Sequence, residues 1–323
     1  MAKGRSGKQR KALPASMLIT DAARQTLDHA LGTVADRLEN VLGTSNRRRQ
    51  HIHDLRVATR RATAALNLFR DSLPKRVRTD VRGTLRALRQ SAGAARDWDV
   101  LLQQLTKKIR HADAPDAPTL DMLAGYALAH RTLTETALEQ AGRQCPPHHL
   151  KKLQTRVAEA VRWKRKAQPT LGDFALPLIG DLVKGFNRLA DRPNPEWSML
   201  HEVRIAGKRL RYTLEVVTGC CDKAVTEQIM PALERLQDIL GDINDSLHTA
   251  QFLRDLLTSM QATAPTAAQR YKSVLTRQIT EQQERMLLGR EAFTTWLNEW
   301  HSPAVQQTLL AAGVPAPEQP RLA

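Results

Sequence analysis

Aromatic side chains are scarce in this chain, where Phe, Trp and Tyr make up 4% of the 323 residues. Proteins that grip single-stranded nucleic acid usually present aromatic rings on which the bases stack, and the basic clusters here mostly lack such neighbours. Apolar runs are short as well, and none approaches the roughly 20 residues that span a bilayer. The sequence therefore argues against a base-stacking protein and predicts no membrane-spanning helix.

Cysteine is also rare, and Cys145, Cys220 and Cys221 lack the spacing of metal ligands. Vicinal cysteines seldom pair with each other, and the N-terminus carries no apolar stretch of the kind found in signal peptides. We therefore expect reduced thiols and a cytoplasmic protein. Signatures of common catalytic sites are missing too: there is no Gly-rich phosphate loop, no nucleophile elbow and no His-Glu-x-x-His motif. We expect no catalytic residues, no bound metal and no cofactor.

Positive charge, in contrast, is abundant. Lys and Arg number 49 against 33 Asp and Glu, so the formal net charge is +16. A charge of this size favours polyanionic partners, namely nucleic acid, anionic membranes or polyphosphate. Because aromatic residues are few, the composition favours a ligand that carries phosphates but no bases.

Most of the chain has the periodicity of amphipathic helices, and no stretch alternates as a strand does. A hydrophobic fraction of 41% suffices for a packed core. The sequence predicts an all-α fold between a disordered basic tail (1–15) and a Pro-rich disordered end (313–323). Helix-breaking clusters divide the chain into segments long enough to pack as antiparallel bundles, at Pro74, 111–118, 145–149, 167–173, 191–197 and 261–266.

The sequence repeats itself at an offset of 148 residues. HDLRVATRR begins at His53 and HEVRIAGKRLRY begins at His201, and the same offset without a gap matches Asp97 with Asp245. A long self-match that keeps polar residues as well as leucines indicates two homologous halves. We place the halves at residues 16–167 and 168–312.

The repeated segment predicts a helix with one basic face and one apolar face. At about 100° per residue, the basic side chains fall in one narrow sector, which contains His53, Arg56 and Arg60 in the first half and His201, Arg204, Lys208 and Arg211 in the second. Tyr212 lies beside His201, to which its hydroxyl could donate a hydrogen bond. The core-facing stripes are formed by Leu55, Ala58, Ala62, Ala65 and Phe69 and by Val203, Ala206, Leu210, Thr213 and Val217.

A second basic row follows in the first half only. It comprises Arg78, Arg82, Arg86 and Arg89, with Arg96 two turns further on; the second half has Thr226, Met230, Glu234, Gln237 and Asn244 at these positions. Like charges at helical spacing repel by roughly a few tenths of a kcal/mol per pair, and a bound polyanion would remove that repulsion. Arg and His suit phosphate oxygens. We expect the two stripes to face each other and form one basic groove, with more charge from the first half.

The two repeated motifs, followed by GAARDWDVL in the first half and LGDINDSLHT in the second, resemble the CHAD family (conserved histidine α-helical domain) over roughly residues 16–310. The resemblance implies two homologous four-helix bundles related by pseudo-twofold symmetry, with a basic central groove or pore. It also implies binding of inorganic polyphosphate and association with polyphosphate granules.

Taken position by position, the resemblance also implies which residues bind polyphosphate. In the first half these are His53, Arg56, Arg60, Arg61 and Arg96, to which the second basic row adds Arg82, Arg86 and Arg89. In the second half they are His201, Arg204, Lys208, Arg209, Arg211 and Tyr212. The second half departs from the pattern at Asn244, which stands where the first half has Arg96.

Two alternatives stay open at this point. One is a metal-dependent phosphohydrolase with His53, His201, Asp97 and Asp245 around a divalent ion, although the Arg and Lys of the stripes would repel a cation. The other is a basic nucleic-acid-binding protein, for which the sequence lacks a helix-turn-helix signature, RNA-recognition aromatics and zinc ligands. An additional role in docking a partner protein through an acidic surface is also open.

Overall fold

The computed structural model describes residues 12–111, 113, 115–193 and 195–311, and every regular element within them is a helix. The predicted all-α class is therefore confirmed. A single isolated bridge, between Leu18 and Thr170, is the β pairing found in these ranges. No helix in the described part of the chain has an apolar stretch long enough to cross a bilayer.

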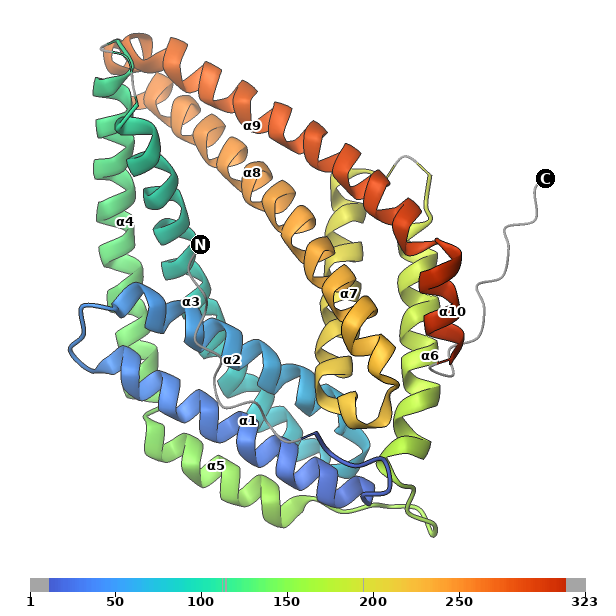
Figure 1. Ribbon diagram of the computed structural model, residues 1–323. Coiled ribbons are helices and arrows are strands. Elements are labelled where there is room, and N and C mark those ends of the chain that lie inside the picture. Colours follow the sequence, from blue (N-terminus) through green and yellow to red (C-terminus); the bar gives the residue numbers. More distant parts are fainter. Residues whose placement is uncertain (1–11, 112, 114, 194, 312–323) are drawn as a thin grey trace.

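Each half of the chain contributes five α-helices to the described residues (Figure 1). The first half contains α1 (Ile19–Leu42), α2 (Arg48–Leu68), α3 (Lys75–Ile109), α4 (Ala117–Gln144) and α5 (Pro147–Ala160). The second half contains α6 (Leu171–Ala190), α7 (Trp197–Val217), α8 (Met230–Thr263), α9 (Pro265–Trp300) and α10 (Pro303–Ala311). Short turns of other helix types lie at Arg70–Ser72, Thr218–Cys220 and Val225–Ile229.

The helix ends follow from local chemistry. Proline stands in the first turn of α4, α5, α8 and α9, where its missing N–H removes no helical hydrogen bond. At the start of α6, the hydroxyl of Thr170 accepts a hydrogen bond from the backbone N–H of Asp173 at 3.2 Å. The carboxylate of Asp173 accepts one from the backbone N–H of Thr170 at 3.3 Å. This capping box fixes where the second half begins.

Equivalent helices of the two halves keep the offset of the sequence repeat. Helix α1 ends at Leu42 and α6 ends at Ala190, while α4 begins at Ala117 and α9 begins at Pro265, so that both pairs are 148 residues apart. In each half, successive helices pack against each other as antiparallel neighbours: α1 on α2, α2 on α3 and α3 on α4, and likewise α6 to α9.

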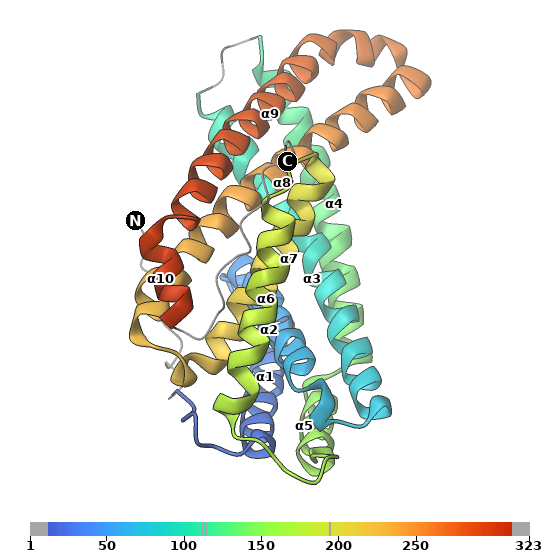
Figure 2. The ribbon, with the colours of Figure 1, turned by 90° about the vertical axis from the view of Figure 1, so that its right-hand side faces the viewer.

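Two long hairpins extend from a broad base (Figures 1 and 2). Helices α3 and α4 contain 35 and 28 residues, and α8 and α9 contain 34 and 36. At 1.5 Å per residue such helices are about 40–55 Å long. The base consists of the shorter helices, where α1 packs on α2 and α5, and α6 packs on α7.

The two halves are joined at both the base and the tips of the hairpins. At the base, one continuous apolar core runs from Leu27 and Leu55 in the first half to Phe186 and Leu210 in the second. At the tips of the hairpins, a second core contains Leu105, Leu120 and Leu123 from the first half and Leu253 and Leu275 from the second. Ion pairs between Lys108 and Glu281 and between Arg277 and Asp116 also join the tips.

The start of the chain is more ordered than the predicted tail. Residues 1–11 and 312–323, which include most of both predicted tails, lie outside the described residues. Residues 12–15, however, belong to the fold, because Leu13 is 5% exposed and the carbonyl of Ala15 accepts a hydrogen bond from the N–H of Gly172. The expectation of disorder up to residue 15 was wrong for these four residues. Leu13 packs in the core and anchors the segment, although the segment's composition is mainly basic and polar.

The close approach of α8 and α9 generates a stability prediction. A Cβ atom at Gly289 would lie 2.5 Å from Cγ1 of the buried Ile243, whereas one at Gly241 would meet no atom within 4 Å. We expect Gly289→Ala to lower the free energy of unfolding by about 1–2 kcal/mol, because the clash outweighs the better helix propensity of Ala. Gly241→Ala should raise it by up to ~1 kcal/mol. Chemical denaturation measures both, and equal stabilisation by the two variants would contradict this packing.

Candidate functional site

Helices α2 and α7 pack against each other between the two halves, and both are amphipathic. The predicted apolar stripes are buried: Leu55 and Ala62 of α2 are 0% and 1% exposed, and Val203 and Leu210 of α7 are both 0% exposed. With one face of each helix fixed in the core, the basic stripes must point away from it. Both stripes reach the space enclosed by the base and the hairpins.

One cavity of about 480 Å³ lies where α2, α3, α7 and α8 meet. We name it the His53 cavity. Its basic side chains come from both halves: His53, Arg56, Arg60 and Arg96 from the first, and His201 and Arg204 from the second. Two carboxylates, Asp97 and Asp245, also line it. The cations therefore outnumber the acids on its walls.

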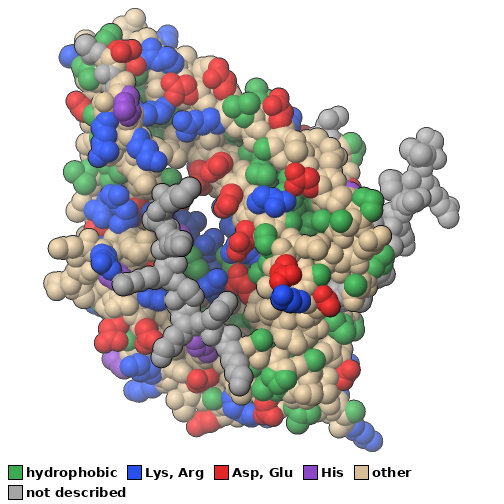
Figure 3. Space-filling model, viewed as in Figure 1, with side chains coloured by type: hydrophobic (Ala, Val, Ile, Leu, Met, Phe, Trp, Pro, Cys, Tyr) green, Lys and Arg blue, Asp and Glu red, His purple; other side chains and the backbone are tan. Residues whose placement is uncertain are grey.

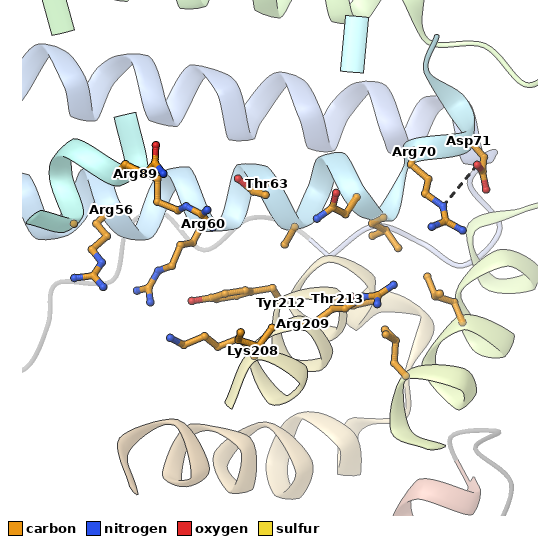
Figure 4. Close-up of a pocket in the computed structure, with 18 of the residues that line it drawn as sticks. Arg56, Arg60, Thr63, Arg70, Asp71, Arg89, Lys208, Arg209, Tyr212 and Thr213 are labelled. Carbon is orange, nitrogen blue, oxygen red and sulfur yellow. Dashed lines mark ion pairs between the residues drawn. The ribbon is translucent and has the colours of Figure 1, made fainter. Parts of the chain in front are cut away.

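A second cavity of about 720 Å³ shares Arg56, Arg60 and Asp97 with the first. We name it the Tyr212 cavity. Arg56 and Arg60 from α2, and Lys208 and Tyr212 from α7, project into the same space (Figure 4). Figure 3 shows a hollow in this face of the molecule, with Lys and Arg side chains in its depth and acidic side chains on its rim. The shared residues make the two cavities adjacent compartments of one basic site.

Three cations of this site form no ion pair, although Asp245 lies close enough to Arg204 to oppose the lowering of its pKa. Within the described part of the chain, Arg60, Arg204 and Lys208 form no ion pair, and the Nε atoms of Arg60 and Arg204 are buried without a hydrogen-bond partner. Buried donors of this kind are normally satisfied. Their cost in the free protein would be removed by a ligand that accepts hydrogen bonds and carries negative charge.

Burial, followed by repulsion between neighbouring cations, lowers the pKa values of several groups in the site. Burial lowers the pKa of Lys208 to about 7, with a further contribution from the repulsion of Arg204 and Arg60. Burial also lowers the pKa values of Arg60 and Arg204, although a guanidinium stays charged at physiological pH. The pKa of His53 is lowered by burial and then by the charge of Arg96. The site therefore binds fewer protons than the same residues would in water.

Two contacts hold the edges of the site. The guanidinium of Arg56 donates a hydrogen bond to Asp97 at 2.9 Å, so this carboxylate orients the arginine. In the second half, Nδ1 of His201 lies 3.1 Å from Oδ1 of Asn244. Asn244 replaces Arg96 in the repeat, so the amide of the second half orients a histidine where the first half adds a positive charge.

Four of the predicted site residues lie outside both cavities. Arg61 and Arg211 are neutralised, because both pair with Glu215 and Arg211 also approaches Glu234 at 3.8 Å. On α3, Arg82 donates to Asn67 at 2.9 Å, and Arg86 is exposed. The same helix brings Arg89 into the Tyr212 cavity and Arg96 into the His53 cavity. Arg209 also lines the Tyr212 cavity.

The expected hydrogen bond from Tyr212 to His201 does not form. The two residues share a helix face but are three turns apart, so about 16 Å of helix axis separates them. Tyr212 is 5% exposed and lines the second cavity, where the guanidinium of Arg211 lies 5.0 Å from its ring centroid. The helical wheel correctly placed Tyr212 and His201 on one face of the helix. A wheel does not show how far apart two residues lie along the helix axis.

Two features of the site were not predicted from the sequence. His248 lines the His53 cavity, because it stands one turn after Asn244 on the same face of α8. The spacing of four residues from Asn244 could have identified it from the sequence. The Tyr212 cavity also has an apolar wall on α6 that includes Phe174 and Leu178. No sequence signal distinguished those residues from ordinary core positions.

The residues of the metal-dependent alternative do come together, since His53, His201, Asp97 and Asp245 all line the His53 cavity. Among the described residues, however, no group of three or more His, Cys, Asp or Glu side chains is placed to hold a metal ion. The intervening side chains are the guanidiniums of Arg56 and Arg204.

Fold and site together define an all-helical protein with partly buried cations between two repeated halves. The sequence matches the model of the CHAD domain over residues 24–254, and the chain belongs to this family. No curated protein matches the chain.

Two solved structures are similar to the whole fold. The crystal structure of the CHAD domain from the plant Ricinus communis is 24% identical with a TM-score of 0.68, and the match covers 91% of this chain and 97% of that one. PptA from Streptomyces chartreusis is 17% identical with a TM-score of 0.67, and the match covers 87% of this chain and 99% of that one.

The unpaired cations predict that the ligand-free protein is strained electrostatically. We expect Lys208→Gln to raise the melting temperature at pH 7 by about 2–4 °C, whereas Lys184→Gln, at an exposed position of α6, should change it little. Because folding lowers the pKa of Lys208 from 10.5 to about 7, the penalty is fully present below pH 7 and disappears as the pH rises towards 10.5. Thermal unfolding at pH 7 and pH 9 tests this, and a Lys208→Gln variant that melts below the wild type at pH 7 would contradict it.

Proposed function

We propose that this protein binds inorganic polyphosphate in the joined His53 and Tyr212 cavities and performs no chemistry on it. The observation that carries the proposal is the set of partly buried cations without counter-charge, Arg60, Arg204 and Lys208. A chain of phosphates offers one negative charge per unit and several acceptor oxygens, so it can satisfy adjacent guanidinium groups in succession. Arg56 and Arg96 extend the same surface.

Membership of the CHAD family supports this ligand, because CHAD domains are in general a polyphosphate-binding fold. We further propose that the repeated helices place equivalent pairs of residues, such as Arg56 with Arg204, on either side of a pseudo-twofold axis along which the polymer lies. Association with polyphosphate granules would follow, since one bound segment of a long polymer tethers the protein to the rest of it.

A polymer without bases fits the charged walls better than nucleic acid does. Single-stranded nucleic acid is held by stacking of bases on aromatic rings, and Tyr212 is almost fully buried beside Lys208. Other aromatic rings are used for packing: Trp98 and Phe252 lie at the hairpin tips, and Trp296 stacks on Trp300 in the base. These four rings are therefore not free to stack on bases, whereas Phe174 lines the Tyr212 cavity.

The proposal predicts a binding defect that depends on the position of the charge. Titration calorimetry with long-chain polyphosphate should give salt-sensitive binding, and an Arg56→Glu/Arg204→Glu variant should bind at least ~100-fold more weakly. The control is Arg143→Glu/Lys223→Glu, because it makes the same change in net charge at two exposed positions outside the cavities. Its affinity should stay within about threefold of the wild type.

Further variants and substrates complete this test. Reversal of Lys3, Arg5 and Lys8, which lie outside the described residues, should also have a small effect. Loss of binding in that variant alone, or equal losses in both pairs of charge reversals, would contradict the cavity site. Displacement of polyphosphate by RNA would favour the nucleic-acid alternative, and metal-dependent release of phosphate would favour an enzyme.

Binding should also take up a proton. In the free protein the pKa of Lys208 is about 7, and bound phosphates should raise it because they stabilise the ammonium form. The affinity is then highest below pH 7 and falls, by about tenfold, as the pH rises through the pKa of the bound state. Calorimetry between pH 7.5 and pH 9.5 measures this, and Lys208→Arg, which keeps its charge, should flatten the profile. An unchanged profile in Lys208→Arg would contradict the role of Lys208.

A further inference from the structure

The Tyr212 cavity has a second wall of opposite chemistry. Phe174, Leu178 and Leu182 stand at every fourth position of α6 and line the cavity in a row. Ile205 of α7 lines it as well and is 54% exposed, although it is a large β-branched apolar residue on the helix that carries the basic stripe. The cavity is therefore basic on one side and apolar on the other.

The proposed polymer gives no reason for this wall. Inorganic polyphosphate is charged along its whole length, so apolar side chains beside it contribute no binding energy. The wall is not closed by the protein either: Phe174, Leu178 and Leu182 are only partly buried. Concave apolar surface next to a few polar groups is typical of sites for small organic ligands, and such sites usually have volumes of about 300–1,000 Å³. The Tyr212 cavity, at about 720 Å³, lies within this range.

Uncharged polar side chains line the cavity as well. They are Thr63, Asn67 and Gln90 of the first half and Thr213 of the second, and the ion pair of Arg70 with Asp71 lies at the end of the cavity away from Arg56 (Figure 4). The Oδ1 atom of Asn67 accepts a hydrogen bond from Arg82 at 2.9 Å, which fixes the amide and leaves its NH₂ group for another partner. The cavity thus combines apolar, uncharged polar and cationic groups.

We infer that the Tyr212 cavity binds a nucleoside 5′-triphosphate, with its base on the apolar wall, its sugar among the uncharged polar groups and its phosphates at Arg56, Arg60 and Lys208. The three parts of such a molecule match the three kinds of side chain that line the cavity. An acyl chain matches less well, because it has no polar middle part. The inference rests on the proposed function in one respect, since the triphosphate uses cations that polyphosphate also uses. Nucleotide and polymer should therefore compete.

The test compares two ligands with the same number of phosphates. Calorimetry of the wild type should show that ATP binds about tenfold more tightly than inorganic tripolyphosphate, because only ATP buries apolar surface on the wall. Ile205→Ser should remove most of this preference and leave the affinity for tripolyphosphate unchanged. Leu288→Ser is the matched control, because Leu288 is 64% exposed on α9 and lies outside the cavity. Ile205 is also exposed, and thermal melting verifies that its substitution leaves the fold intact.

Each outcome decides between the two proposals. Equal affinities for ATP and tripolyphosphate, or a preference that survives in Ile205→Ser, would overturn the nucleotide site. If long-chain polyphosphate binds and ATP does not, the nucleotide site fails and the polyphosphate site stands. If ATP binds with the expected preference and polyphosphate does not bind, the proposed function fails and the cavity is a nucleotide site alone. Loss of bound ATP on addition of polyphosphate would support both.

Discussion

The cations between α2 and α7 repel one another, and the surrounding fold has to hold them together. Arg60, Arg204 and Lys208 are partly buried and have no carboxylate partner in the described part of the chain. Burial weakens hydration while mutual repulsion remains, so this arrangement costs free energy in the absence of a ligand. The opposite faces of the same two helices offset that cost, because Leu55 and Leu210 are completely buried in the core.

Closure at two places keeps the repelling surfaces at a fixed distance. A joint at the base alone would let the halves rotate apart around it. The core at the hairpin tips prevents this, and it is strengthened by the stacking of Trp98 on His130 at 4.7 Å and by the edge contact of Trp98 with Phe252 at 5.4 Å. These aromatic residues thus stabilise the core that joins the hairpin tips. Although aromatic residues are few in this chain, they help to hold the two halves around the cations.

The fate of each arginine depends on which carboxylates the tertiary structure brings to it. Arg61 meets Glu215 across the contact between α2 and α7. Arg211 pairs with the same carboxylate one turn along its own helix, and the tertiary structure adds Glu234 of α8 at 3.8 Å. Arg60, only one position before Arg61, points into the cavities and stays unpaired. Neutralised cations rigidify the protein, whereas unpaired ones retain binding energy for an anion. The net charge of the chain therefore identifies the site less well than the few cations that form no ion pair.

The helices, the repeat and the two amphipathic stripes can be predicted from the sequence alone. These features depend on local periodicity and on residue identity at a fixed offset, so His53, Arg56, Arg60 and their counterparts could be predicted without a structure. The helix breaks were likewise marked by proline and polar clusters, and Leu13 was missed because one apolar residue in a basic segment is a weak signal.

Which members of a basic row reach the site depends on the tertiary structure. Arg82 and Arg89 belong to the same row of α3, but only Arg89 lines a cavity. The tertiary structure also brings the apolar row of α6 to the same cavity as the cations. The physical reason is that periodicity gives the direction of a side chain around its own helix, whereas a site depends on what another helix, distant in sequence, places in front of it.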